Sequence, residues 1–163
     1  MGKVETHLKV KIIFLVGLMF LIYSSVQLVG ADLKKINNIV NNGAVAMVKI
    51  GRSEIRAEMA TTDPEREKGL SNRGSLESDA GMVFIYDKPL QPSFWMKGVL
   101  FPIDIIWVYN SKVVETTTNI PVAGSSTQLP TYSPRVNVDT VIEVNAGWVD
   151  NNGIRVGDRV KID

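Results

Sequence analysis

The chain has 163 residues, a formal net charge of +1, no cysteine and a single histidine, His7. Its length gives room for one packed domain. The near balance of 18 basic and 17 acidic residues gives no electrostatic footprint for nucleic acid, so we expect no nucleic-acid partner. Because thiols are absent and the histidine lies near the N-terminus, we also expect no metal site, no cofactor and no serine–histidine pair in the folded part.

The first 31 residues have the organisation of a secretory signal peptide. Three lysines precede the apolar run Ile12–Tyr23, and small residues before a cleavage site after Ala31 complete the pattern. The alternative is an uncleaved membrane anchor, because Ile12–Val29 provides 18 residues, near the minimum that spans a bilayer. In both interpretations the basic flank stays in the cytoplasm. Residues from Asp32 onward are therefore predicted to be exported, whether periplasmic, extracellular or anchored facing outward.

Residues 32–43 form a polar, asparagine-rich spacer, and residues 44–163 are predicted to form the folded domain. Removal of residues 1–31 would take away three lysines and one glutamate, so the formal charge would fall from +1 to −1. We expect a monomer that contacts the membrane only through its N-terminal segment.

The domain is predicted to consist mainly of short strands separated by turn residues. Asn110-Ser111 resembles a two-residue hairpin turn, and loops are expected at Asp87–Pro89 and over residues 121–134. The pattern predicts a mainly β fold, a compact barrel or sandwich of about 7–9 short strands with one or two short helices. The predicted strands are Ala44–Ile50, Ser53–Ala60, Gly81–Tyr86, Phe94–Lys97, Ile103–Tyr109, Lys112–Ile120, Val136–Val144 and Ile154–Ile162.

One helix start is well marked. With Thr62 as N-cap, Glu65 falls at the third helical position and completes a capping box, and Gly69 ends the helix. A second helical turn is expected within residues 145–152. The run Asp150–Gly153 carries oxygen ligands but lacks the spacing of a calcium loop, so it is predicted to be a plain turn.

Several short motifs occur together in a fixed order. They are Lys68-Gly69-Leu70 with Arg73, Gly81-Met82 with Phe84, Phe94-Trp95-Met96-Lys97, Pro102 with Asp104, Val141-Ile142-Glu143, Ala146-Gly147 and Gly157-Asp158. As a set they resemble the family called domain of unknown function 192 (DUF192), over about residues 48–162. The resemblance implies a small, mainly β domain, often behind a signal or anchor, with no established activity. Ser71 stands where the family commonly has methionine, and Gly98-Val99 replaces its usual Asn-Thr, so a pocket at these positions would have changed.

Asp104 is an isolated carboxylate within an apolar strand. An unpaired carboxylate there would be expensive, so it needs a partner or access to water. One hypothesis makes it a pocket acid with a raised pKa. The favoured hypothesis makes it a structural group, bonded to an arginine or to backbone donors.

The arginines Arg66 and Arg73 have two interpretations. Guanidinium groups suit the bidentate recognition of a carboxylate or phosphate. Alternatively, they pair with Glu58, Glu143 or Asp104 and hold the helix against the sheet. The structural interpretation is favoured for Arg66, and the two are evenly balanced for Arg73.

Side chains alternate between the two faces of a strand, so Trp95 and Met96 should point to opposite sides. One would face the core, and an exposed Trp95 beside Lys97 could stack against a ring or a sugar. Glu143 alternates with Ile142 and Val144, which predicts a strand residue on a solvent-exposed face.

The leading functional hypothesis is an exported, non-catalytic domain that binds a small-molecule ligand or an envelope protein. Its groove would lie near Arg73, Trp95, Lys97 and Asp104, with Met96 and Arg66 as further candidates. The first alternative is an envelope-associated enzyme that uses Asp104 as acid or base, with Arg73 or Lys97 holding an anion. The second is a purely structural module in which the charges only pair with one another.

Overall fold

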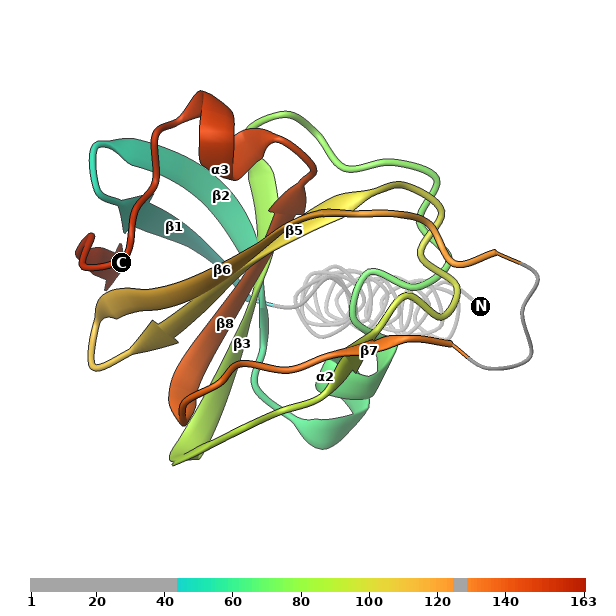
Figure 1. Cartoon of the computed structure of the whole chain (residues 1–163), viewed down its shortest axis with the longest axis horizontal. Helices are drawn as coiled ribbons and strands as arrows, with labels where there is room; N and C mark the ends of the chain where they lie inside the picture. Colours follow the sequence, from blue (N-terminus) through green and yellow to red (C-terminus); the bar gives the residue numbers. More distant parts are fainter. Residues whose placement is uncertain (1–43, 125–128) are drawn as a thin grey trace, which may run out of the picture. The chain divides into compact units, whose positions relative to one another are not determined.

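The computed structural model describes residues 44–124 and 129–163 (Figure 1). The predictions of a signal peptide or anchor and of a spacer fall outside these residues. The described part is mainly β, with two short helices, as predicted. Its elements are β1 (Val45–Ile50), β2 (Ser53–Ala60), α2 (Asp63–Lys68), β3 (Ala80–Leu90), β4 (Phe94–Trp95), β5 (Ile103–Tyr109), β6 (Lys112–Ile120), β7 (Thr131–Tyr132), β8 (Val138–Asn145), α3 (Trp148–Asn151) and β9 (Val160–Ile162).

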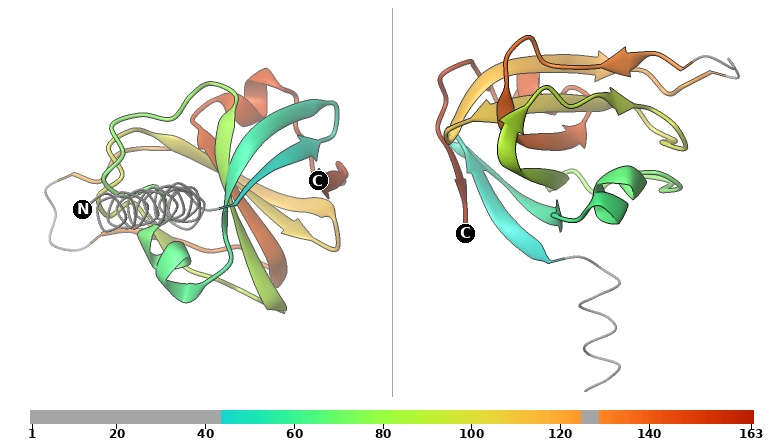
Figure 2. Two further views of the ribbon diagram at one scale, coloured as in Figure 1. Left: turned by 180° about the vertical axis from the view of Figure 1, so that it is seen from behind. Right: turned by 90° about the horizontal axis from the view of Figure 1, so that it is seen from below.

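Seven strands form one curled sheet, in the order β6-β5-β8-β3-β2-β1-β9, while β4 and β7 pair separately. The β2–β3 pair is parallel, and the connection between these strands passes through α2. At one end of the sheet its two edges meet, because Val160 N donates to Ser111 O at 2.9 Å and Val113 N donates to Asp158 O at 2.9 Å. The sheet is therefore a half-barrel whose strands spread apart away from this seam (Figures 1 and 2).

The two faces of the sheet bury separate apolar clusters. The α3-side core contains Val48, Ile50, Ile55, Ala57, Val83, Ile106, Val108, Val113, Ile142, Val144, Trp148, Val149, Ile154 and Val160. The α2-side core contains Ala60, Leu70, Met82, Phe84, Met96, Val99, Ile103, Ile105, Trp107, Ile120, Val138 and Val141. Adjacent residues of β3, β5 and β8 alternate between the clusters, so these central strands are buried on both sides.

Aromatic rings order the α2-side core. The Phe94 ring meets Phe84 edge-on at a centroid distance of 4.9 Å and Trp107 at 5.6 Å. Trp107 Nε1 donates to Thr117 Oγ1 at 2.9 Å, which satisfies its buried polar group. Phe94 belongs to β4, so these contacts fix the small β4–β7 ribbon against the main sheet.

The cap of α2 follows the prediction. Glu65 N donates to Thr62 Oγ1, and Thr62 N donates to Glu65 Oε2 at 2.9 Å, which is the reciprocal capping box. The backbone N–H groups of Thr62 and Thr61 lower the pKa of Glu65 to about 2. Gly69 ends the helix with a φ of +46°, a conformation that residues with a Cβ rarely adopt.

Hairpin turns also agree with the sequence. Asn110 and Ser111 both have positive φ, 50° and 58°, which matches the right-handed twist of the β5 and β6 strands they join. Gly153 has a φ of 62°, consistent with the predicted turn after α3.

Four predicted segments need correction. The predicted strand Phe94–Lys97 ends at Trp95, as β4. β3 continues to Leu90 through the expected loop Asp87–Pro89, and a register irregularity between Ile85 and Leu90 accommodates the proline. The expected loop over residues 121–134 contains β7, which pairs with β4. The final strand is confined to Val160–Ile162, because the preceding residues form turns at the seam.

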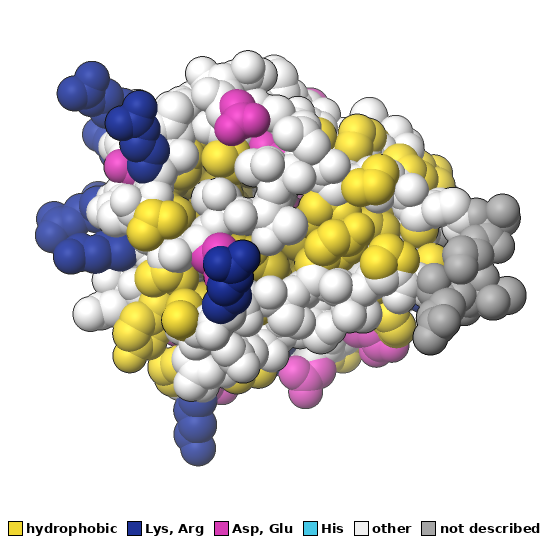
Figure 3. Space-filling model, viewed as in Figure 1, with side chains coloured by type: hydrophobic (Ala, Val, Ile, Leu, Met, Phe, Trp, Pro, Cys, Tyr) yellow, Lys and Arg dark blue, Asp and Glu magenta, His cyan; other side chains and the backbone are white. Residues whose placement is uncertain are grey.

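The surface is uneven in character. On the face seen in Figure 3, lysine and arginine side chains gather at the end of the sheet that carries the β1–β2 and β5–β6 turns. Hydrophobic side chains gather across the middle of this face and toward the opposite end. Within residues 44–124 and 129–163, no helix has the length and apolar character needed to cross a bilayer.

Candidate functional site

Glu143 lies at the centre of the sheet. It belongs to β8, between β3 and β5, where it faces Met82 on one side and Ile105 on the other. The residue is only 5% exposed, so the prediction that it lies on a solvent-exposed face was wrong. The alternation along the strand is as expected, but α2 and the segments beside it cover the face to which Glu143 belongs.

The Glu143 carboxyl lacks a hydrogen-bond partner at one of its oxygens. Its Oε2 atom is buried, and no described group lies within hydrogen-bonding distance to donate to it. Burial raises the pKa of Glu143 from its ordinary value of 4.5 to about 8, and the positive charge of Arg73 offsets only part of this rise. The carboxyl is therefore mainly protonated at neutral pH, which is the usual response of an acid buried without a partner.

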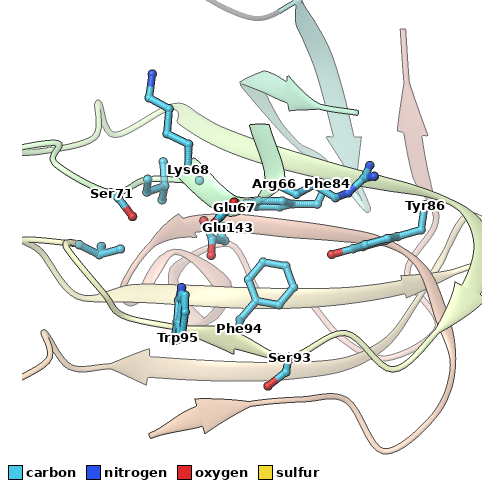
Figure 4. Close-up of a pocket in the computed structure, with 13 residues that line it drawn as sticks. Arg66, Glu67, Lys68, Ser71, Phe84, Tyr86, Ser93, Phe94, Trp95 and Glu143 are labelled. Carbon is cyan, nitrogen blue, oxygen red and sulfur yellow. The ribbon is translucent and has the colours of Figure 1, made fainter. Parts of the chain in front are cut away.

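A pocket of about 250 Å³ opens beside this carboxyl. Figure 4 shows Glu143, Phe94 and Tyr86 pointing toward the same space. The lining joins α2, the segment after it, β3, β4 and β8. Its residues are Arg66, Glu67, Lys68, Gly69, Leu70, Ser71, Phe84, Tyr86, Ser93, Phe94, Trp95, Val99 and Glu143.

Aromatic side chains make up much of the wall. Phe84 is buried, Phe94 and Tyr86 are half-buried, and Trp95 is 49% exposed at the mouth. Burial raises the pKa of Tyr86 to about 12, so its hydroxyl stays protonated and available as a donor or acceptor. The arrangement therefore combines apolar rings with a few polar atoms, as ligand pockets generally do.

Arg66 is held at the rim by several contacts. Its guanidinium donates to Thr61 O at 2.6 Å, to Ile85 O at 2.8 Å and to Asp63 Oδ1 at 2.6 Å. It also lies 5.2 Å from the centre of the Tyr86 ring. These bonds support the favoured structural interpretation, because they use the guanidinium to join α2 to β3.

Arg73 lies apart from this pocket. Its Nη1 and Nη2 atoms bind the two oxygens of Glu58 at 2.5 and 2.6 Å, and the hydrogen bond lowers the pKa of Glu58. Both side chains line a separate hollow together with Glu77 and Leu76. The arginine is thus paired as in the structural hypothesis, although its charge still reaches Glu143.

Trp95 and Met96 point to opposite sides, as the strand pattern predicts. Met96 is buried in the α2-side core, whereas Trp95 separates the main pocket from a shallow hollow of about 390 Å³. Lys97 lines that hollow, with its ammonium nitrogen 5.3 Å from the centre of the Trp95 ring. Trp95 and Lys97 are thus brought together, as expected.

Asp104 is a structural carboxylate. It is fully buried, and its Oδ1 and Oδ2 atoms accept hydrogen bonds from Asn119 N at 2.7 Å and Val149 N at 3.0 Å. It lies opposite Val144, on the face of the α3-side core, whereas Glu143 lies on the other face. The favoured interpretation of Asp104 as a group bonded to backbone donors is confirmed, and the structure does not place it in a groove with Trp95.

A comparison with known protein families also identifies the domain. The profile of the DUF192 family, described as an uncharacterized ACR, matches residues 46–162. The chain belongs to the DUF192 family. The search of curated proteins found no match.

Two solved structures share the fold of this DUF192 domain. One is the crystal structure of a candidate transcription regulator from Sinorhizobium meliloti 1021, with 24% identity and a TM-score of 0.68 over 74% of this chain and 95% of that chain. The other is a protein of unknown function from Novosphingobium aromaticivorans DSM 12444, with 29% identity and a TM-score of 0.66 over 72% of this chain and 84% of that chain. Both show that the half-barrel architecture occurs in crystal structures.

The two departures from the DUF192 pattern lie beside the pocket. Ser71 Oγ donates to Lys97 O at 2.8 Å, and Asn72 N donates to Gly98 O at 2.7 Å. Ser71 and Val99 both line the main pocket. The substituted positions are therefore neighbours in space, and they shape the same site.

Sequence reasoning missed the buried position of Glu143. A usable signal was Val141, which shares its face and is apolar, so that face of β8 had to be covered. Phe84 and Tyr86 belong to the same site, and their alternation along β3 was visible in the sequence. Among the described residues, no three acidic or histidine side chains are grouped so that they could hold a metal ion.

Proposed function

We propose that this domain binds a small ligand in the pocket between Glu143 and Trp95. The observation that carries the proposal is Glu143, which lines an open pocket while its buried Oε2 atom has no hydrogen-bond partner. Buried polar groups in folded proteins are nearly always hydrogen-bonded. A ligand that supplies the missing donor would relieve this cost, and the aromatic wall would bury its apolar part.

Binding is favoured over catalysis by the composition of the pocket. Glu143 is a single acid, Ser71 Oγ is engaged with the Lys97 carbonyl, and Arg66 is held by three oxygen atoms. The enzyme hypothesis relied on Asp104, whose two oxygens are already occupied by backbone N–H groups. The raised pKa of Glu143 is what a general acid would need, so it is the one observation that favours an enzyme as the second candidate.

We propose further that the domain acts outside the cytoplasm as a monomer. The basic, apolar and small-residue order of residues 1–31 supports this location. Mass spectrometry of the protein from its host should find Asp32 at the mature N-terminus. An intact N-terminus in the membrane fraction would support the anchor, and an intact N-terminus in the cytoplasm would contradict both.

A ligand screen tests the binding proposal. The purified protein is screened against a library of small metabolites by NMR, with the indole resonances as reporters. Ligands of this pocket should perturb Trp95, and Trp95→Ala should weaken them. Tyr109→Ala is a matched control, because Tyr109 is 45% exposed and is not among the residues that line the pocket. Equal ligand affinity in Trp95→Ala, Tyr109→Ala and the wild type would contradict the assignment of the site to this pocket.

A further inference from the structure

No described cation is bonded to Glu143 Oε2. The guanidinium of Arg73 is engaged in two hydrogen bonds to Glu58. The guanidinium of Arg66 binds Asp63 and two backbone carbonyls. Figure 4 shows the Lys68 ammonium directed away from Glu143. The groups that face Glu143 or lie beside its pocket are thus all accounted for: Arg66, Glu67 and Lys68 of α2, Tyr86 of β3, and the Arg73–Glu58 pair.

In its ionised form, Glu143 would lack a counterion. Acidic residues are almost never fully buried in proteins unless they are paired. Glu143 is buried next to an open space, and neither Arg66 nor Arg73 could pair with it without giving up bonds that it already makes. A positive group brought by a ligand would let Glu143 ionise without breaking these bonds.

The walls also favour a cation. The faces of aromatic rings carry partial negative charge and attract ammonium groups within about 6 Å. Phe94, Tyr86 and Trp95 line the space beside Glu143, and the Trp95 ring already has the Lys97 ammonium nitrogen 5.3 Å from its centre. A carboxyl surrounded by aromatic rings is a suitable receptor for an organic ammonium ion.

The volume limits the size of such a ligand. The pocket has a volume of about 250 Å³, below the roughly 300–1,000 Å³ common for ligand pockets, so its ligand should be small. The apolar part of that ligand would lie against Phe94 and Trp95.

We propose that the ligand of this pocket is a small organic amine, whose protonated nitrogen binds Glu143 and whose apolar part contacts the aromatic wall. This inference rests on the proposed binding function. The neutral carboxyl gives up its proton to the buffer when the ammonium group binds, so that a carboxylate–ammonium pair replaces a carboxylic acid. One proton is released for each ligand bound, and no other bond forms or breaks.

The pH dependence follows from this exchange. Because Glu143 must lose its proton, affinity should rise roughly tenfold per pH unit below about pH 8 and become constant above it. This holds while the amine itself stays protonated, which aliphatic amines do well above pH 8.

Three probes of one shape separate the charge classes. Benzylamine, benzyl alcohol and benzoate are titrated into the protein by calorimetry at pH 6, 7 and 8. We expect benzylamine to bind more tightly as pH rises, with release of about one proton per ligand at pH 6 and about half a proton at pH 8, measured in buffers of different ionisation enthalpy. Tighter binding of benzoate or benzyl alcohol than of benzylamine, or benzylamine binding that does not change with pH, would overturn the inference.

Two variants assign the effect to Glu143. Glu143→Gln keeps the shape of the side chain but cannot become charged, and it should weaken benzylamine at least tenfold and weaken benzyl alcohol much less. Glu67→Gln is the matched control, because Glu67 is an exposed acid that lines the same pocket. An equal loss in both variants would attribute the effect to general charge and contradict the inference.

The library screen separates failure of the inference from failure of the proposed function. If the ligand that perturbs the Trp95 resonance is uncharged or anionic, the binding function is supported and the inference of an amine ligand is contradicted. If no library member and none of the three probes perturbs Trp95, both proposals fail.

Discussion

Two buried carboxylates lie on neighbouring strands of this sheet, yet their surroundings differ completely. Asp104 on β5 accepts two backbone hydrogen bonds within the α3-side core. Glu143 on β8 faces the α2 side, where its Oε2 atom lacks a donor and a pocket opens beside it. Burial of a charge is therefore not itself a sign of function. A buried acceptor oxygen that lacks a hydrogen-bond donor and belongs to a residue lining a pocket is the better indication of a functional site.

The roles differ because of what each carboxyl can reach. Val149 lies in α3, and Asn119 lies near the end of β6 with a positive φ of 55°. Asp104 therefore joins two separate segments to β5 through their N–H groups. Glu143 has neighbouring strands on both sides, whose N–H groups are used in the sheet, so only an approach from the α2 side can satisfy its side chain.

The largest expected effect is a pH dependence of stability due to Glu143. The unfolded chain releases this proton near pH 4.5, whereas the folded protein holds it to about pH 8. The folded state binds more protons between these values, so the stabilisation present below pH 4.5 is lost as pH rises through about 8. At about 1.4 kcal/mol per pH unit, the loss is at most about 5 kcal/mol.

Urea unfolding of the wild type and Glu143→Gln between about pH 5 and about pH 9 measures this loss. The free energy of unfolding should fall with pH more steeply in the wild type, and the variant should be the more stable protein at the alkaline end. Parallel curves would show that Glu143 is not buried as described.

Asp104→Asn should have the next largest effect. The amide retains one acceptor oxygen for two buried N–H donors, and the hydrogen bonds lose their charge assistance. We expect a loss of about 3 kcal/mol in the free energy of unfolding. Glu143→Gln at pH 7 is the matched control and should not destabilise. Similar losses in the free energy of unfolding for both variants would contradict the distinction between a hydrogen-bonded Asp104 and an unbonded Glu143.

Arg73→Met tests the coupling between the paired arginine and Glu143. Removing the charge should raise the pKa of Glu143 above about 8, because Arg73 now lowers it. The half-buried pair with Glu58 should contribute about 1 kcal/mol to stability. NMR titration of the Glu143 carboxyl carbon measures the first effect. A Glu143 pKa that falls or does not change would contradict the placement of Arg73.

Trp95→Ala should change the free energy of unfolding by less than about 1 kcal/mol, because half of the side chain is exposed. Its effect should be confined to ligand binding. Met96→Ala is the informative contrast, since Met96 is buried and its truncation should cost about 2–5 kcal/mol. Urea unfolding of the two variants measures this difference. A larger loss of stability in Trp95→Ala than in Met96→Ala would contradict the prediction.

Local patterns predicted much of the fold correctly. The capping box at Thr62 and Glu65, the turn at Asn110-Ser111 and the opposite orientation of Trp95 and Met96 depend on residues close in sequence. Each is decided by backbone geometry or by a short side chain that reaches its own backbone. The prediction that Asp104 binds backbone donors also held, because a carboxylate between isoleucines has few other solutions.

The errors concern information that is not local. Alternation gives the faces of β8 but not which of them is covered, and α2 and β4 come from distant parts of the chain to cover Glu143. The segment Asp87–Pro89 has the composition of a loop, yet the irregular register of β3 lets it continue as a strand. The pocket therefore could not be assembled from the sequence, and of the candidate ligand-binding residues only Arg66 and Trp95 line it.

The two edges of the half-barrel sheet meet at one end only, and this affects how the protein can associate with other molecules. β9 is three residues long and covers part of the edge of β1, where the exposed side chains Val45 and Met47 lie. Short edge strands that carry charges such as Lys161 discourage pairing with other molecules. Loss of the last few residues would uncover a longer and more apolar edge. We therefore expect removal of Val160–Ile162 to promote self-association.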